Sequence, residues 1–352
     1  MLYRFKGGED GVYPAASLVN LNGTFYGTTA FGGRVGYGTV FSITPSGKEH
    51  VIYSFRGSSD GSMPYSGLTV LGGKLYGTTS SGGRAGGTVF SITPSGKFQV
   101  IYSFEGSNDD GDEPVASLVA AGGVLYGTTT SGGQHNWGTV FKVTPSGDER
   151  TLYSFAGGND GQAPSGSLIF RKGVLYGTTR GTIDGSFEAW GTVFSVTTSG
   201  NEHVLYRFKG PPDGGTPYAG LALLNDVLYG TTVGGGASGW GTVFALTLSG
   251  KERILHSFKG GSDGQNPRAP LSVVNGKLYG TTILGGNEQQ RCDGCGTIFQ
   301  STTSGSEGVI YSFQDDPDGA GPAAGLVSVG GELYGTTESG GYGYGTVFTK
   351  SP

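Results

Sequence analysis

The chain has 352 residues, a formal net charge of −5 and only 14% charged residues. This acidic balance offers no basic surface for phosphates, so nucleic acid is not an expected partner. No apolar run is long enough to span a membrane, and residues 1–6 lack the apolar core of a secretion signal. With 72 Gly and 15 Pro the composition is close to that of low-complexity chains, but 12% aromatic residues argue for a folded core.

Four short motifs recur along the chain in the same order, each in seven copies. The string Y-G-T-T recurs at spacings of 50 to 55 residues. The other three are [YH]-[SR]-F, Asp-Gly-x-x-Pro and G-T-[VI]-F. The Y-G-T-T copies begin at Tyr26, Tyr76, Tyr126, Tyr176, Tyr229, Tyr279 and Tyr334. A fixed period of this length indicates a solenoid, a propeller or an array.

Each repeat contains four predicted short strands. In chain order, residues 2–5 predict a first strand, and 18–21, 38–44 and 51–55 predict others. The second Y-G-T-T copy predicts a strand over 75–79. Thr, Val, Ile, Tyr and Phe fill these segments, while Gly, Pro, Ser and Asn fill the turns between them. No helical periodicity is visible.

Four antiparallel strands in about 50 residues match one propeller blade. The sequence therefore predicts an all-β, seven-bladed β-propeller that forms a single domain over residues 1–352. The chain starts on the fourth strand of a blade and ends just after a third strand. We therefore expect the N-terminal strand to complete the last blade, which removes two open sheet edges.

The repeated L-Y-G-T-T, G-T-V-F and I-Y-S-F strings resemble the GloVer tandem repeat of bacterial secreted and surface-anchored proteins. The resemblance covers essentially the whole chain. It implies an extracellular or cell-surface propeller-like domain and no particular chemistry. A secretion signal is absent from this sequence, and a monomer is expected.

The loops that join the second strand to the third, and one repeat to the next, vary in length and composition. In an up-and-down blade these two kinds of loop emerge on the same face, which we call the variable face. Variable loops on a rigid scaffold are where binding is expected.

The residue after the repeated Pro opens the innermost strand and should surround the mouth of the central channel. Tyr65, Tyr218 and Arg268 occupy this position, and Glu113 and Asn266 occupy the position before the Pro. They predict a ligand site at the mouth. The alternative is that the tyrosines simply fill the channel.

The residue before G-T-[VI]-F holds all three tryptophans, Trp137, Trp190 and Trp240. Exposed aromatic rings can stack on sugars; the alternative is that they cover the blade edge. His135 lies in the same kind of loop. Two long insertions add polar candidates for ligand binding and catalysis: Arg180, Asp184, Glu188, Glu288, Gln290 and Arg291.

Two further patterns suggest structural roles. Cys292-x-x-Cys295 lies in a long loop with no helix or second Cys pair nearby, so a local disulfide is favoured over a redox or zinc site. The Asp of each Asp-Gly-x-x-Pro is expected to close a turn. Calcium is left open only at the two acid-rich copies, residues 108–113 and 315–318. No other cofactor is predicted.

The predicted function is binding of an extracellular carbohydrate or other polar polymer at the variable face and channel mouth. A polysaccharide-active hydrolase or lyase is the first alternative, because carboxylate pairs or a Tyr base could act there. A protein-interaction scaffold is the second. The catalytic candidates are Tyr65, Tyr218, Arg268, Glu113, Asp184, Glu188 and Glu288.

Overall fold

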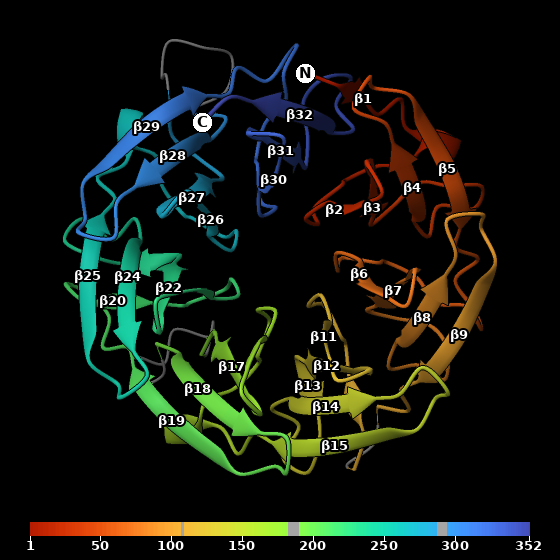
Figure 1. Ribbon diagram of the computed structural model, residues 1–352, viewed down its shortest axis with the longest axis horizontal. Helices are drawn as coiled ribbons and strands as arrows, with labels where there is room; N and C mark the ends of the chain where they lie inside the picture. The colour runs from red at the N-terminus through yellow and green to blue at the C-terminus, as the bar shows by residue number, and fades with distance from the viewer. Residues whose placement is uncertain (107–108, 182–189, 287–293) are drawn as a thin grey trace.

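The computed structural model describes residues 1–106, 109–181, 190–286 and 294–352. Seven four-stranded antiparallel sheets stand around a central axis as the blades of a β-propeller (Figure 1). The predicted all-β, seven-bladed architecture is confirmed. No helix in these described ranges is long and apolar enough to cross a membrane.

The blades are numbered in chain order, and each runs from an inner strand to an outer one. The innermost strands are β2 (Val19–Leu21), β6 (Thr69–Leu71), β11 (Val119–Ala121), β16 (Ile169–Arg171), β21 (Ala222–Leu224), β26 (Ser272–Val274) and β30 (Val327–Val329). The second strands carry Y-G-T-T: β3 (Thr24–Thr29), β7 (Lys74–Thr79), β12 (Val124–Thr129), β17 (Val174–Thr179), β22 (Val227–Thr232), β27 (Lys277–Thr282) and β31 (Glu332–Thr337).

The third strands begin at the Thr of G-T-[VI]-F, and the outermost strands precede the repeated Phe. The third strands are β4 (Thr39–Ile43), β8 (Thr88–Ile92), β14 (Thr139–Val143), β18 (Thr192–Thr197), β24 (Thr242–Thr247), β28 (Thr297–Ser301) and β32 (Thr346–Lys350). The outermost are β5 (Glu49–Ser54), β9 (Phe98–Ser103), β15 (Glu149–Ser154), β19 (Glu202–Arg207), β25 (Glu252–Ser257), β29 (Glu307–Ser312) and, in blade 7, β1 (Tyr3–Arg4).

The N-terminal strand closes the ring, as predicted. β1 pairs antiparallel with β32, with Tyr3 opposite Val347 and Arg4 opposite Thr346. Phe5 follows β1 and is fully buried in a cluster that includes Phe41 and Val347. The first residues of the chain therefore hold blade 7 and blade 1 together.

The Gly of Y-G-T-T leaves space for the Phe of G-T-[VI]-F on the neighbouring strand. In blade 3 a Cβ added at Gly127 would lie 2.6 Å from the ring of Phe141. The second Thr of the motif also pairs with the third strand, because the hydroxyls of Thr129 and Thr139 are 2.8 Å apart. The same hydroxyl pair occurs in all seven blades. Packing of one ring over one glycine explains why the motif repeats unchanged.

Substitution Gly127→Ala is expected to lower the melting temperature clearly, because the new methyl group would overlap the Phe141 ring. Overpacking of this kind costs about 1–3 kcal/mol. Gly308→Ala, on the outer strand β29, is the matched control, because no atom lies within 4 Å of its added Cβ. Thermal unfolding followed by circular dichroism measures both. Equal melting temperatures for the two variants would contradict this account of the motif.

Neighbouring blades meet through apolar side chains and the first Thr of Y-G-T-T. Tyr26 of blade 1 packs with Leu68, Leu75 and Phe90 of blade 2. The hydroxyl of Thr28 donates to the carbonyl of Ser66, 2.8 Å away in the next blade. These contacts bury the two apolar faces that a lone blade would expose to water.

The two variable loops of a blade are tied to each other on one face of the ring. In blade 3 the strands β10 (Gly111–Asp112) and β13 (Ser131–Gly132) pair, and in blade 5 β20 (Gly214–Gly215) pairs with β23 (Gly234–Gly235). Single bridges such as Val12 with Phe31 do the same elsewhere. Three 3-10 turns, η1 (Gly8–Asp10), η2 (Gly158–Asp160) and η3 (Gly261–Asp263), also lie in these loops.

Candidate functional site

The central channel narrows sharply below its mouth. The third residue after each repeated Pro is small or is itself Pro: Ser17, Gly67, Ser117, Ser167, Gly220, Pro270 and Gly325. The backbone N–H of Gly67 donates to the hydroxyl of Ser117, 2.8 Å away in the next blade. A Cβ at Gly220 would lie only 2.6 Å from the carbonyl oxygen of Ser167. The blades therefore nearly touch, and the channel retains a cavity of about 100 Å³.

The residue after each repeated Pro lines this cavity, as predicted. The seven residues are Ala15, Tyr65, Val115, Ser165, Tyr218, Arg268 and Ala323. Four of the seven are Ala, Val or Ser. The aromatic rings and the positive charge at the mouth therefore come from the two tyrosines and the arginine. They come from blades 2, 5 and 6.

The residue before each repeated Pro has a positive φ, which is rare for side chains other than Gly. Examples are Tyr13 at 65°, Glu113 at 56° and Asn266 at 57°. Backbone hydrogen bonds impose this conformation: Asn266 N–H donates to the carbonyl of Trp240 at 3.0 Å and its own carbonyl accepts from Ile283 N–H at 3.4 Å. The residues flanking the channel thus sit on a rigid backbone.

Tyr218 lies near two guanidinium groups. The Arg268 guanidinium carbon is 5.7 Å from the centre of the Tyr218 ring, and that of Arg180 is 5.9 Å from it. Arg268 is exposed, while Arg180 and Tyr218 are half-buried. Both distances fit a cation–π contact. The cluster combines an aromatic ring with two positive charges and their hydrogen-bond donors.

A second group at the mouth centres on Tyr13 and Glu338. Burial, followed by the neighbouring Glu338 carboxylate, raises the pKa of Tyr13. Burial also raises the pKa of Glu338, and the interaction with Tyr13 and the positive charge of Arg268 oppose this rise. The Tyr13 ring packs edge-on to Tyr65 at 6.5 Å and to Phe31 at 6.0 Å. Burial, with a smaller effect of Tyr218 and Glu338, raises the pKa of Tyr65.

Sequence reasoning missed Tyr13 and Glu338, although the repeats contained a signal for both. Glu338 follows Y-G-T-T, where five of the other copies have Ala30, Ser80, Thr130, Val233 and Ile283. The remaining copy has Arg180 in this position. Glu338 and Arg180 are therefore the two charged residues among seven equivalent positions. Tyr13 precedes the repeated Pro and is the only aromatic residue in that position.

Buried polar atoms without hydrogen-bond partners also lie at the mouth. The side-chain oxygen of Asn266 is one of them, and Nε of Arg180 is another within the described part of the chain. Glu113, by contrast, is exposed and accepts a hydrogen bond from the Thr130 hydroxyl at 3.1 Å. Unsatisfied polar atoms in a buried position are expected to take a ligand or solvent partner.

The aromatic residues before G-T-[VI]-F pack against glycines of the adjacent inter-blade loop. A Cβ at Gly157 would lie 2.8 Å from Trp137, and one at Gly210 would lie 2.4 Å from Trp190. Trp137 and Trp240 are each 41% exposed. The packing alternative therefore accounts for one side of the Trp137 ring, while Trp137 and Trp240 keep exposed surface. Trp190 is half-buried and packs against the core. His135 is exposed in the same loop as Trp137.

Several predicted residues fall outside the described part of the chain: Asp184, Glu188, Glu288, Gln290, Arg291 and Cys292. The catalytic and ligand-binding roles assigned to them stay predictions. The Cys292–Cys295 disulfide stays a prediction as well; Cys295 is buried, 2% exposed, in the core cluster that also holds Phe313 and Phe348.

The repeated Asp closes a turn, as predicted, and also links two neighbouring blades. In blade 3 the Tyr153 hydroxyl donates to Asp160 at 2.7 Å, and the Ala156 N–H donates to the same carboxylate at 2.6 Å. Glu202, on the outer strand of the next blade, completes a Tyr–Asp–Glu junction. Three other junctions are built from Tyr3, Asp10 and Glu49, from Tyr102, Asp110 and Glu149, and from Tyr206, Asp213 and Glu252.

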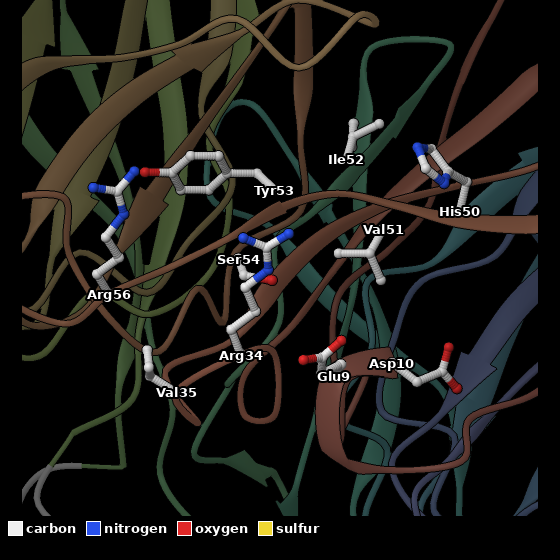
Figure 2. Close-up of a pocket in the computed structure, with 10 residues that line it drawn as sticks. All are labelled: Glu9, Asp10, Arg34, Val35, His50, Val51, Ile52, Tyr53, Ser54 and Arg56. Carbon is white, nitrogen blue, oxygen red and sulfur yellow. The ribbon is translucent and has the colours of Figure 1, made fainter.

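A wider groove of about 700 Å³ lies along the outer strand of blade 1. Figure 2 shows that its lining combines the cations Arg34 and Arg56 with the acids Glu9 and Asp10 and with His50. Asp10 is committed to its own turn, where it accepts hydrogen bonds from Tyr3 and from the Lys6 N–H. The groove has mixed charge, and the aromatic residue in its lining, Tyr53, is already stacked on Phe98 at 4.0 Å and donates its hydroxyl to Asp60.

Comparison with known proteins supports the repeat and the fold. The model of the Gloeobacter/Verrucomicrobia repeat matches residues 1–185 and 180–352. No protein with a curated function matches the chain.

Among solved structures, a puromycin hydrolase S511A mutant complexed with PGG gives a TM-score of 0.61 at 12% identity, covering 93% of this chain and 50% of that one. A Mycobacterium tuberculosis puromycin-hydrolyzing peptidase gives 0.56 at 10% identity, covering 91% and 48%. This chain thus spans about half the length of these two enzymes. A Bacteroides uniformis protein named putative 6-phosphogluconolactonase gives 0.53 at 14% identity, covering 91% and 88%. Identities this low show a shared propeller fold and nothing more.

Proposed function

The chain belongs to the Gloeobacter/Verrucomicrobia repeat family, and from that premise we propose that it binds an extracellular carbohydrate or other polar polymer at the channel mouth. The observation that carries the proposal is the convergence of Tyr218, Arg268 and Arg180 at a ring whose other members, apart from Tyr65, are small. Aromatic faces stack on sugar rings, and guanidinium groups bind carboxylates and hydroxyls through several parallel hydrogen bonds.

The size of the cavity supports a ligand that lies across the mouth. About 100 Å³ is well below the 300 Å³ or more of typical small-molecule pockets. A single substituent, such as a hydroxymethyl or carboxylate group, fits inside while the rest of the polymer rests on the variable face. The unpartnered oxygen of Asn266 and the Tyr13–Glu338 pair supply acceptors for the hydroxyl groups of such a ligand.

The electrostatics argue against Tyr65 as the base of a lyase. A lyase would need a tyrosine that loses its proton near neutral pH. Burial raises the pKa of Tyr65, so its hydroxyl stays protonated near neutral pH and is not available to remove a proton. The predicted disulfide Cys292–Cys295 and the extracellular or cell-surface location form part of the same proposal, because disulfides persist in oxidising compartments.

Arg268→Ala and Tyr218→Ala are each expected to weaken binding at least tenfold, because each removes one side of the cation–aromatic cluster. Affinity electrophoresis through gels that contain plant or bacterial polysaccharides measures the effect, after a glycan array has selected the polysaccharide. Lys48→Ala is the control, since Lys48 lies in the turn between the third and fourth strands of blade 1, away from the mouth.

Two other results would change the assignment. Release of new reducing ends or unsaturated uronates from the bound polysaccharide would make the protein an enzyme. Absence of retardation over a broad panel, together with retention of a protein partner on the immobilised chain, would favour the interaction scaffold.

A further inference from the structure

One junction between blades differs from the Tyr–Asp–Glu junctions in a way that changes its chemistry. Between blades 5 and 6, His256 occupies the position of the Tyr, while Asp263 and Glu307 keep their places. A phenol with a raised pKa, as at Tyr206, offers a donor hydrogen to its Asp and is a poor metal ligand. A neutral imidazole nitrogen in the same place offers a lone pair.

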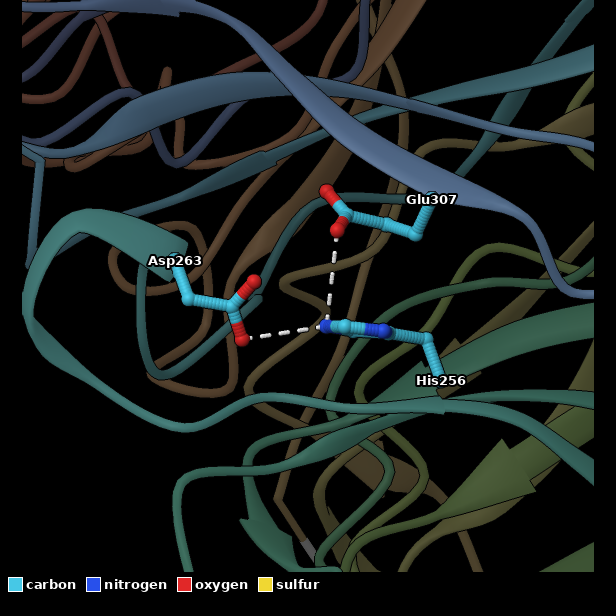
Figure 3. Close-up of side chains that lie close together, drawn as sticks. All are labelled: His256, Asp263 and Glu307. Carbon is cyan, nitrogen blue, oxygen red and sulfur yellow. Dashed lines mark hydrogen bonds and ion pairs between the residues drawn. The ribbon is translucent and has the colours of Figure 1, made fainter.

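The three side chains converge on one point. Figure 3 shows His256 Nε2 facing both carboxylates, at 3.1 Å from Asp263 Oδ2 and 3.5 Å from Glu307 Oε2. All three atoms lie within 4.8 Å of one another. A tetrahedral Zn²⁺ with bonds of about 2.0–2.1 Å separates its ligand atoms by about 3.3 Å. Two of the three separations already match this spacing.

The surroundings favour a cation at that point. The side chain of Glu307 is only 5% exposed, and that of His256 is 15% exposed. Glu307 Oε1 is buried and has no hydrogen-bond partner among the described residues. Asp263 is positioned by the Lys259 N–H, which donates to Oδ2 at 2.7 Å. Two carboxylates held this close with so little water are stabilised by a shared positive ion.

We propose that His256, Asp263 and Glu307 form a binding site for a divalent transition-metal ion, best suited to Zn²⁺, that joins blades 5 and 6. Imidazole nitrogen with carboxylate oxygen is a Zn²⁺ donor set and is unsuited to Ca²⁺, which prefers oxygen ligands alone. Water would complete the coordination. The site is separate from the channel mouth and does not depend on the proposed carbohydrate binding.

Isothermal titration of the untagged full chain with ZnCl₂ tests the site, with CaCl₂ as the comparison. We expect one Zn²⁺ per chain and a higher melting temperature with Zn²⁺, as linkage requires for an ion that binds the folded state. CaCl₂ should have no such effect at this site. His256→Tyr restores the residue of the other junctions, so the variant should fold and bind Zn²⁺ at least tenfold more weakly. Glu307→Gln provides a second loss-of-site variant.

The reciprocal change provides an independent gain of function. Tyr206→His would place an imidazole beside Asp213 and Glu252 and should raise the stoichiometry from one Zn²⁺ to two. His203→Gln, which alters an exposed histidine, should leave binding unchanged. Zn²⁺ affinity that is equal in the wild-type, His256→Tyr and Glu307→Gln proteins would overturn the proposal, as would the absence of any Zn²⁺ uptake by the wild type; His256 would then act only as a hydrogen-bonding substitute for Tyr.

Discussion

Removal of residues 1–6 is expected to lower the melting temperature by roughly 10 °C or more. The deletion takes away β1, whose pairing with β32 closes blade 7, and Phe5, which is fully buried. Loss of a buried Phe side chain alone costs about 3–5 kcal/mol. The deletion would also expose the edge of β32 to solvent and to other chains.

Differential scanning calorimetry of the shortened and full chains measures this effect. Deletion of residues 351–352 is the matched control, because both are exposed and lie after the last strand. Phe5→Ala should lower the melting temperature by part of this amount, because it removes the buried ring and keeps the backbone pairing of β1. A shortened chain that melts at the same temperature as the full chain would show that the N-terminal strand does not hold the ring closed.

Stability is expected to fall as the pH rises from about 5 to 8, which is unusual for an acidic protein. At the four Tyr–Asp–Glu junctions, burial and then the neighbouring Asp raise the pKa of the Glu to about 7, from its ordinary value of 4.5. These residues are Glu49, Glu149, Glu202 and Glu252. One carboxyl oxygen of each is buried without a hydrogen-bond partner among the described residues.

The direction follows from proton linkage. Well below pH 4.5 each Glu is protonated in both the folded and the unfolded chain. The buried carboxyl is then uncharged, and its contribution to the free energy of unfolding is at its maximum. Between pH 4.5 and about 7 the unfolded chain loses its protons first, so the free energy of unfolding decreases as the pH rises. Lys6, Arg207 and Lys209 moderate the effect at three of the junctions. After allowance for solvent screening, we expect about 1 kcal/mol per junction.

Melting temperatures measured at about pH 5 and pH 8 test this, with a decrease of roughly 5–10 °C expected. Glu149→Gln imitates the protonated carboxyl, so it should raise the melting temperature at pH 8 and have little effect at pH 5. Glu9→Gln, at an exposed carboxyl, is the control and should leave the difference between the two pH values unchanged. A melting temperature that rises with pH over this interval would contradict the assignment.

The fold could be predicted because each repeated motif makes contacts within its own blade. Gly127 accommodates the Phe141 ring, and the Thr129 hydroxyl pairs with that of Thr139. Neither contact depends on the position of the blade in the ring. Closure by residues 2–5 was also predictable, since the order of strands at the two ends leaves one way to complete the last blade. Tyr65, Tyr218 and Arg268 could be placed at the mouth for the same reason.

The full set of residues at the channel mouth and at the His256–Asp263–Glu307 cluster could not be predicted, because it depends on which blades face one another. Tyr13 and Glu338 are 325 residues apart in the chain and meet only because the ring closes. His256 and Glu307 belong to different repeats, and only the packing of blade 5 against blade 6 brings a nitrogen and two carboxylates to one point. The sequence by itself determined the blade, the number of blades and the residues that vary. The tertiary structure decided which of those residues converge and how narrow the channel is, because both depend on distances between separate sheets.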